Sequence, residues 1–551
     1  MKNCIKKYIA ALALSPMLLS SCSDSFLTEY NPNNEVGETF WTSKDNVISA
    51  LAGVYNPIRD HMYGYYGVYS GIWNNSMRAD DLYPTRGEES WGWGVLNFTN
   101  TTESGSGTSN IWSSLYKGVQ LANNFIYFSQ TVPDIDKDDL DEMLGEAYFI
   151  RGFHYFLLHI NFRDAIIRTL PQEVDPADRP LSSGADVLKQ CEEDFRMAKS
   201  LLPKARPSSQ NGRILQGAAS AMLGKTLLWQ GKYGEAKAEL GTTITDYGYD
   251  LMDDYSQNFD NSHEFNAESV YEINYEKIDG ANNDTWGDQT GPNAGMWNCI
   301  ANFFAPECDK GGWYKMQPSA QLIKEFIAEE RPDGANSRFD KRLYTTCFFP
   351  LYDYGEGTVE DEELAWGSIT FETMWEKGLS KKLNPKPDFP QIDGKEGRFL
   401  LKKWSAWWCT AGASFYAGNE ARDFNLRVMR FAEVLLLHAE ACLGDNDVTG
   451  AMADINRVRV RAGLSELALT DKIEATKELR HQKLLEFAGE NIRWYDLIRW
   501  YDTESALKDY LIRTKDSGQN ISAMKEKHRY LPIPQGEVDG NSEVEQKAEW
   551  K

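Results

Sequence analysis

Two segments of this chain place small residues at the spacing of two closely packed helices. In the first segment, Gly224 and Ala236 lie twelve positions apart, so that a small residue on one helix faces a small residue on the next. Ala439 and Ala451 repeat this separation in the second segment. Helix pairs of this kind bury a continuous core only by stacking on one another, and this requirement restricts the possible folds strongly.

The neighbouring residues extend the match to the tetratricopeptide pattern. The further positions are Leu223, Tyr233 and Leu240 in 220–243, and Leu435, Ile455 and Val458 in 435–458. A half-match with Cys191, Phe195 and Ala198 predicts a second helix that ends at Pro203, with its partner helix over 146–160. We therefore predict a mainly α fold, a tetratricopeptide-like scaffold of stacked helix pairs. Amphipathic patterns predict further helices over 46–58, 111–128 and 140–160.

A long loop-rich insertion interrupts this scaffold. Between about 250 and 425 the helical period fades, and the stretch DGANNDTWGDQTGPNAGMWN at 279–298 has the composition of a loop. We predict a single domain over 41–551, with the helical scaffold at about 41–250 and 425–551. Long irregular insertions in a helical scaffold are usually functional. The oxygen-rich stretch 250–261 lacks the spacing and the glycine of an EF-hand, so we expect a solvated turn there.

The N-terminus has the features of a lipoprotein signal peptide. Lysines at positions 2, 6 and 7 precede an apolar run over 8–19 that is too short to span a bilayer. The run ends in Leu19-Ser20-Ser21-Cys22, which resembles the bacterial lipobox. We predict a signal peptide over 1–21, a lipid on Cys22 and a polar tether over 22–40. The lipid would be the only attachment to the membrane.

Charge and cysteine spacing exclude several classes of function. The net charge of -24 disfavours binding to nucleic acid, which requires clustered lysine and arginine. The cysteines form no CxxC motif and have no histidine at metal-ligand spacing, so we predict neither a metal site nor a cofactor. Cys299 and Cys308 are close enough for a disulfide within one loop, and buried free thiols are the alternative.

Tryptophans cluster in glycine-rich and polar segments. The segment ESWGWGV carries Trp91 and Trp93, each followed by a glycine that leaves the indole face open. A second cluster within the insertion contains Trp286, Trp297, Trp313 and Tyr314. We expect a third group, Trp404, Trp407 and Trp408, to lie in the core.

Exposed indoles on loops can stack on nucleobases, form a hot spot for a protein partner, or stack on sugar rings. The acidic charge argues against nucleobases. Polar residues near the tryptophans suit the hydroxyls of a neutral polyol, and Asp81, Arg86 and Asn97 are the candidates near the first cluster. The other possibility is that the tryptophans belong to the core.

Several stretches carry a family resemblance. They are CSDSFLTEYNPN near the start, ADDLYPTRGEESW and IWSSLYKGVQLANNFI in the first third, and LRHQKLLEFAGENIRWYDLIRW and YLPIPQGEVDGN near the end. Together they resemble the SusD/RagB-like lipoproteins of Bacteroidetes. The resemblance implies a non-enzymatic lipoprotein of the outer membrane that faces the cell exterior. It also implies delivery of oligosaccharides to a TonB-dependent SusC-like transporter, with a glycan face that includes the regions of Trp91, Trp93 and 283–314.

Two alternatives remain open at this point. A lipid-anchored glycoside hydrolase would need two carboxylates across the scissile bond, and Glu88, Glu89, Asp284 and Asp288 are candidates. A subunit that only contacts the transporter would use the tryptophans at that interface. As the glycan, we favour a β-glucan or a hemicellulose, whose extended backbones suit flat indoles.

Charged residues near the C-terminus have a structural explanation. Arg480, Glu486, Glu490, Arg493 and Asp496 are placed at helical spacing around apolar residues. We interpret these charges as internal ion pairs that close the scaffold, and not as catalytic groups.

Overall fold

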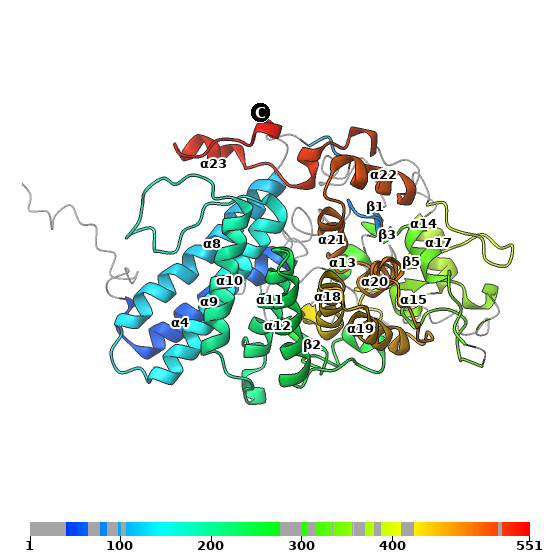
Figure 1. Ribbon diagram of the computed structural model, residues 1–551, viewed down its shortest axis with the longest axis horizontal. Coiled ribbons are helices and arrows are strands. Elements are labelled where there is room, and N and C mark those ends of the chain that lie inside the picture. The colour runs from blue at the N-terminus through cyan, green and yellow to red at the C-terminus, as the bar shows by residue number, and fades with distance from the viewer. Residues whose placement is uncertain are drawn as a thin grey trace, which may run out of the picture.

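The computed structural model describes residues 40–63, 78–84, 97–100, 106–275, 300–305, 312, 314–332, 334–354, 356, 370–379, 387–408, 424–515 and 521–551. Its N-terminal part is an array of helices that lie side by side (Figure 1). These helices are α4 (Lys44–Tyr63), α8 (Ser106–Phe128), α9 (Lys137–Phe162), α10 (Gly184–Leu201), α11 (Gln216–Trp229) and α12 (Tyr233–Asp246). Polar side chains start two of them, since Asp136 accepts hydrogen bonds from the first turn of α9 and Ser183 does so for α10.

The predicted helix pairs are present. A Cβ atom added to Gly224 of α11 would lie 2.5 Å from Cγ of Leu240 in α12, so the glycine allows these helices to approach closely. Gly152 of α9 lies in the same way against Asp194 and Phe195 of α10. Arg151 of α9 donates two hydrogen bonds to Asp194, at 3.0 and 2.6 Å, and joins the two helices through a buried ion pair.

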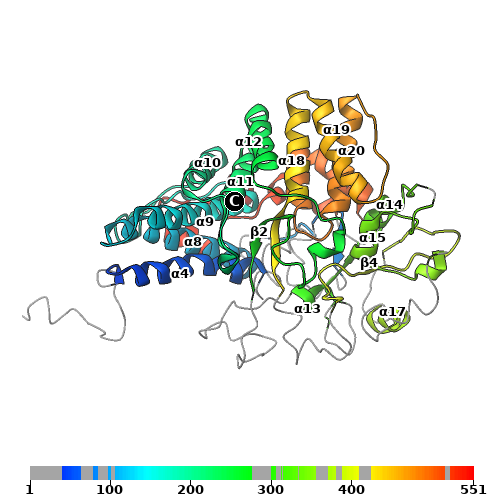
Figure 2. The same ribbon diagram turned by 90° about the horizontal axis from the view of Figure 1, so that it is seen from below.

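A second block of helices follows the insertion and lies beside α12 (Figures 1 and 2). Its members are α18 (Phe431–Gly444), α19 (Val448–Arg461), α20 (Lys472–Glu486), α21 (Arg493–Trp500) and α22 (Glu504–Thr514). Helix α23 (Gln535–Gly540) lies apart from this block, above α8 in the view of Figure 1. Ala439 in α18 and Ala451 in α19 are fully buried, as the twelve-residue spacing predicts. The last segment returns to the N-terminal array, where the Leu531 amide donates to the carbonyl of Asn161, 2.7 Å away.

The region between the two blocks contains short elements. They are β2 (Ser269–Ile273), α13 (Ile300–Phe304), β3 (Met316–Pro318), α14 (Ala320–Phe326), α15 (Lys341–Thr346), β4 (Cys347–Phe348), α17 (Phe371–Leu379), β5 (Leu400–Leu401) and β6 (Leu426–Arg430). In the described residues the strands form three antiparallel pairs, β1 (Leu82–Pro84) with β3, β2 with β6, and β4 with β5.

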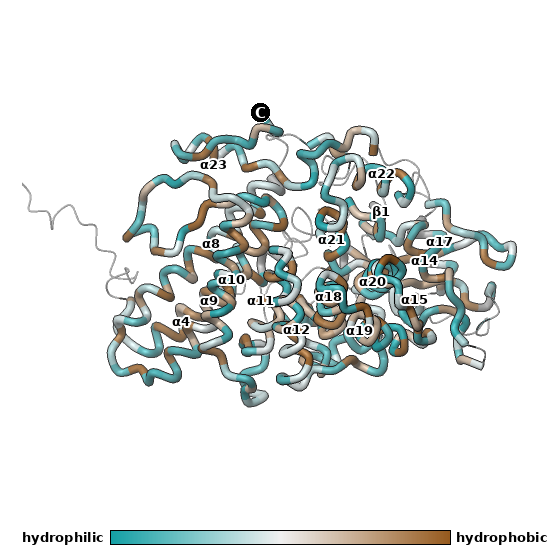
Figure 3. Tube along the Cα trace, viewed as in Figure 1, coloured by the Kyte–Doolittle hydropathy of each residue, from teal (hydrophilic) through white to brown (hydrophobic). Residues whose placement is uncertain are grey.

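Hydrophilic and hydrophobic residues alternate along most helices, so that each has an apolar face for the core (Figure 3). Helices α11 and α18 are different, because most of the residues of each are buried. None of the described helices combines the length and the apolar composition needed to cross a lipid bilayer.

The stretch 250–261 is only partly solvated, which corrects the prediction of a solvated turn. Tyr255 and Phe259 are buried, with their rings 5.0 Å apart. Among the described residues, no group of three or more His, Cys, Asp or Glu side chains is arranged to hold a metal ion.

Candidate functional site

The ribbon β1–β3 joins two segments that are distant in the sequence. Leu82 pairs with Pro318 and Pro84 pairs with Met316, and the Ser319 amide donates to the Asp81 carbonyl at 3.1 Å. Pro84 is the last described residue before Trp91 and Trp93, and Met316 lies shortly after Trp313. The described residues that precede Trp91 in the sequence are therefore paired with those that follow Trp313.

Most of the predicted glycan contacts lie outside the described residues. This applies to Trp91, Trp93, Trp286, Trp297, Trp313 and Arg86, and to the predicted lipid site Cys22. It applies equally to Cys299 and Cys308 and to the carboxylates considered for hydrolysis, Glu88, Glu89, Asp284 and Asp288.

The structure buries the other three predicted contacts, which corrects their expected role. Tyr314 has a φ of 42° and is 1% exposed, so its ring belongs to the core and not to an open platform. Asp81 is also 1% exposed, and one of its carboxylate oxygens accepts the Gly489 amide at 3.1 Å. Asn97 is 6% exposed. These side chains lie beneath the surface, so Tyr314 is not available to stack on a sugar ring, and Asp81 and Asn97 are not available to bond its hydroxyl groups.

Two neighbouring carboxylates attach β1 to the C-terminal block. Asp80 accepts from Nε of Arg493 at 2.8 Å and from the Tyr510 hydroxyl at 2.6 Å. Burial opposes its ionisation, but Arg493 and the hydrogen bonds outweigh burial and lower the pKa of Asp80. Among the residues that the structure describes, Asp81 has no such basic partner of its own, and burial raises its pKa to about 6.

Four of the five charged residues near the C-terminus form internal ion pairs, as predicted, and the fifth, Arg480, packs on an aromatic ring. Glu486 is fully buried and is paired with Arg342, Arg430 and Arg461. Burial disfavours the charged form of Glu486, but the three guanidinium groups lower its pKa well below the usual range. The other members of the predicted set also have internal partners, namely Lys403 and Arg430 for Glu490, Asp80 for Arg493, Lys483 and Arg499 for Asp496, and the Trp500 ring for Arg480.

The third tryptophan group lies in the core, as predicted. Trp404 is 2% exposed, and its indole Nε1 donates to the Gly489 carbonyl at 2.9 Å. Trp407 and Trp408 are partly buried and pack against the same core. Three cysteines within the described residues, Cys191, Cys347 and Cys442, are buried free thiols.

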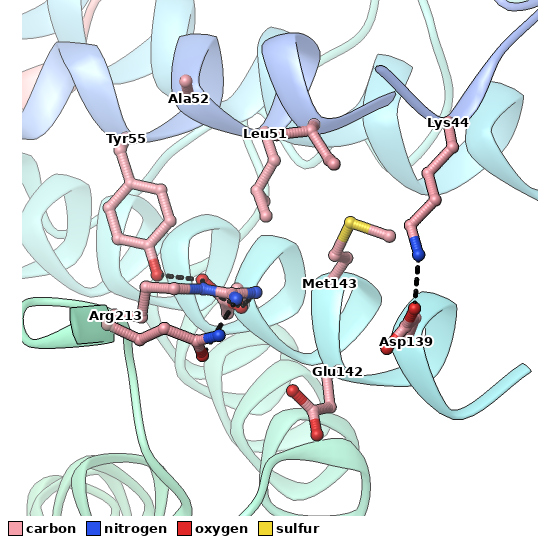
Figure 4. A pocket seen from close by; sticks show the side chains of 11 residues that line it. Lys44, Leu51, Ala52, Tyr55, Asp139, Glu142, Met143 and Arg213 are labelled. Carbon is pink, nitrogen blue, oxygen red and sulfur yellow. Dashed lines mark hydrogen bonds and ion pairs between the residues drawn. The ribbon is translucent and has the colours of Figure 1, made fainter. Parts of the chain in front are cut away.

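The structure also contains a hollow of about 430 Å³ that sequence analysis did not find. It lies between α4 and α9, and Leu51 and Met143 point toward each other across it (Figure 4). At one end the Lys44 ammonium lies 2.5 Å from the Asp139 carboxylate. At the other end are Tyr55 and Arg213.

A buried carboxylate organises the second end of this hollow. Glu146 is fully buried and accepts hydrogen bonds from the Tyr55 hydroxyl, from Nη2 of Arg206 at 3.0 Å and from Nε of Arg213 at 3.1 Å. Burial and the Glu146 carboxylate raise the pKa of Tyr55, so its hydroxyl keeps the proton that it donates. Since 60 to 91 residues separate these side chains from Glu146, no local sequence pattern could reveal the cluster.

Known proteins share both sequence and fold with this chain. A model described as "SusD family" matches residues 267–550, and one described as "Starch-binding associating with outer membrane" matches residues 26–228. A SusD-like protein of Bacteroides ovatus is 24% identical over 525 residues, which cover 91% of this chain and 84% of that protein. SusD-like protein P25 of Formosa agariphila is 24% identical over 544 residues, with 95% of each chain covered.

Solved structures agree with this relationship. A SusD superfamily protein of Bacteroides vulgatus superimposes with a TM-score of 0.73 and 27% identity, covering 93% of this chain and all of the other. A structure described as "Laminarin binding SusD-like protein" has a TM-score of 0.68 and 22% identity, with 92% and 99% of the two chains covered. Because the SusD family model spans more than half of the chain, this protein belongs to the SusD family.

Proposed function

We propose that this protein is a cell-surface lipoprotein that binds a polysaccharide or its oligosaccharides on a tryptophan platform and passes them to a TonB-dependent SusC-like transporter. The observation that carries the proposal is the β1–β3 ribbon. It pairs Pro84 with Met316, and so brings together the described residues that flank Trp91, Trp93 and Trp313. Trp286 and Trp297 would extend the same platform, and Arg86 would bond hydroxyl groups beside it.

The chemistry of the platform fits a neutral glycan without catalysis. Indole rings stack on the apolar faces of sugars, and each aromatic contact contributes about 0.5–1.5 kcal/mol beyond the burial of area. A single site would therefore bind in the micromolar range or more weakly, and several contacts along one polysaccharide would add avidity. A lipid on Cys22 would hold the protein at the outer membrane, and the 22–40 tether would leave it free to reach the transporter.

The family descriptions suggest which glycans to test first. One of the matching family models is described as starch-binding, and one related structure is described as laminarin-binding. Laminarin is a β-glucan, the class that the flat indoles favour, and starch is the natural comparison.

Affinity electrophoresis of the lipid-free protein, from Ser23 onward, tests the proposal. Gels would contain laminarin, starch, xylan, xyloglucan or mannan. We expect retardation in at least one of them, and loss of this retardation in a Trp91→Ala/Trp313→Ala variant, since both changes remove stacking surface. The matched control is Trp375→Ala, which replaces a partly buried tryptophan that stacks on Phe371 of α17. Its mobility should stay that of the wild type.

Three results would contradict the proposal. Retardation that survives the double substitution would place the glycan elsewhere. Retardation in no gel, together with loss of transporter co-purification in the double variant, would instead assign the tryptophans to the transporter interface. Hydrolysis of a retained glycan that disappears after Glu88→Gln or Asp284→Asn would identify an enzyme.

A further inference from the structure

The hollow between α4 and α9 is one of three that meet around the turn at 210–213. The other two have volumes of about 250 Å³ each. Arg213 lines all three, and Tyr55 lines the first and the second. Asn211 and Gly212 line both the second hollow, beside α4 and β2, and the third, beside Tyr247 and Tyr249. We call this continuous surface the 210–213 groove.

The charges that line the groove cancel. Its basic residues are Lys44, Arg59, Arg206 and Arg213, and its acidic residues are Asp139, Glu142, Glu146 and Glu272. The charges at the centre of the groove neutralise one another, because Glu146 forms ion pairs with both Arg206 and Arg213. A groove with balanced and mutually satisfied charges gives no advantage to an anion or a cation, and it favours a neutral ligand.

Two amides in the groove are available for such a ligand. Asn211 and Asn274 both line the second hollow and both are exposed. Neither side chain forms a hydrogen bond with the described part of the chain. Each offers two donors and one acceptor, which is the bonding pattern that sugar hydroxyls complement.

Gly212 keeps the groove open between these amides. It has a φ of +90°, and a Cβ atom added there would lie 3.5 Å from Cβ of Asn274 and 3.7 Å from the Phe265 ring. A side chain would therefore fill the space that connects the second and third hollows. Beyond it, the half-buried rings of Tyr247 and Tyr249 line the third hollow, with centroids 6.5 Å apart. Aromatic rings beside free amides are the usual composition of a site for a neutral polyol.

We propose that the 210–213 groove is a second carbohydrate-binding site, which takes a neutral oligosaccharide with Asn211 and Asn274 as its polar contacts. The choice of ligand rests on the proposed glycan-binding function. Among the described residues, the groove is lined by the helical array, β2 and the loops beside them, whereas the residues that flank Trp91, Trp93 and Trp313 belong to the β1–β3 ribbon. The apolar walls of Leu51, Ala52 and Met143 extend the groove along α4, so a chain of several sugar units could lie along it.

The test separates the two sites. Laminarihexaose, maltohexaose, cellohexaose and xylohexaose are titrated into the wild type and into the Trp91→Ala/Trp313→Ala variant by calorimetry and ligand-observed NMR. We expect this variant to retain weak binding of the hexasaccharide that the wild type binds. Adding Asn211→Ala/Asn274→Ala to this variant should lower its remaining affinity for the hexasaccharide about tenfold, which is the effect of losing two hydrogen bonds. Adding Ala52→Trp, which fills the groove from an exposed position on α4, should weaken it as well.

A matched control uses the same turn. Ser208→Ala/Ser209→Ala changes two exposed side chains that line none of the three hollows, and it should leave the remaining binding unchanged. Remaining binding that is insensitive to the changes at Asn211, Asn274 and Ala52 would overturn the groove proposal. Loss of all binding in the Trp91→Ala/Trp313→Ala variant would also overturn the groove proposal, but it would agree with the proposed tryptophan platform. A wild type that binds none of the four hexasaccharides would refute both proposals.

Discussion

Two buried glutamates of this protein have similar partners and different surroundings. Glu486 lies between the insertion and the C-terminal block, where Arg342, Arg430 and Arg461 are all nearly inaccessible to solvent. Glu146 lies in the N-terminal array and also forms ion pairs with arginines. One of these, Arg213, has a side chain that is 31% exposed and lines an open groove. The same chemistry closes the core in one place and builds the floor of a surface site in the other.

A buried ion pair is therefore not by itself a sign of function. What distinguishes the two clusters is the access of solvent to their partners. A cluster enclosed on all sides holds elements together, and removal of one of its charges leaves an excess of the opposite charge in a medium of low dielectric constant. Where one partner reaches solvent, the cluster holds polar groups in place for a ligand and tolerates change better.

The largest expected effect is at the enclosed cluster. Glu486→Gln should lower the free energy of unfolding by about 3–5 kcal/mol, because it leaves three buried guanidinium groups without a shared carboxylate. Chemical denaturation followed by circular dichroism measures this change. Glu474→Gln is the control, since its pair with Lys477 is exposed and should contribute nothing measurable. A Glu486→Gln variant as stable as the control would show that the cluster does not close the scaffold.

The cluster beside the groove should be less sensitive. Glu146→Gln should lower the free energy of unfolding by about 1.5–3 kcal/mol, the range for hydrogen bonds to a charged group, because water can solvate Arg213 in the variant. The same denaturation experiment makes the comparison. A loss equal to that of Glu486→Gln would remove the distinction drawn between the two clusters.

Helix spacing within the array gives a third test. Gly224→Ala should cost about 1–3 kcal/mol, because the new methyl group would overlap the Leu240 side chain and force α11 and α12 apart. Gly53→Ala in α4 is a matched control with no atom within 4 Å of the added Cβ, and it should stabilise the protein by up to about 1 kcal/mol. Thermal unfolding of both variants gives the comparison. If Gly224→Ala stabilised the protein as Gly53→Ala does, the helices α11 and α12 would not be in close contact at Gly224.

The smallest expected effect depends on pH. His438 of α18 lies 2.5 Å from Asp454 of α19, and although burial opposes protonation, this carboxylate raises the pKa of His438 to about 9. The folded pKa exceeds the unfolded value of 6.5, so the stabilisation is fully present below pH 6.5 and is lost as the pH rises to about 9. After allowance for solvent access to the ring, we expect a loss on the order of 1 kcal/mol.

Denaturation between pH 6 and 9.5 measures this loss. The control is His438→Gln, which has no proton to release in this range. The wild type and the variant should therefore differ most at pH 6 and converge near pH 9.5. Parallel curves for the two proteins would indicate that His438 is already neutral in the folded state.

Helices were the most predictable part of the fold. The twelve-residue spacing of Gly224 and Ala236 identified a helix pair, because a close helical contact requires small residues at set positions in a local segment. The half-match ending at Pro203 identified α10 and its partner α9 for the same reason. Burial of Tyr314 was not predictable, since its positive φ turns a residue from a glycine-rich segment into the core.

The sequence alone determined the helical pairs, the internal role of the C-terminal charges and the family, because each depends on residues close together in the chain or on motifs in a set order. The tertiary structure decided which arginines meet Glu486, which side chains meet at Glu146, and that Pro84 pairs with Met316. It also opened the 210–213 groove between α4, α9 and β2. These contacts join residues separated by tens to hundreds of positions, and only the packing of the whole chain determines which of them become neighbours.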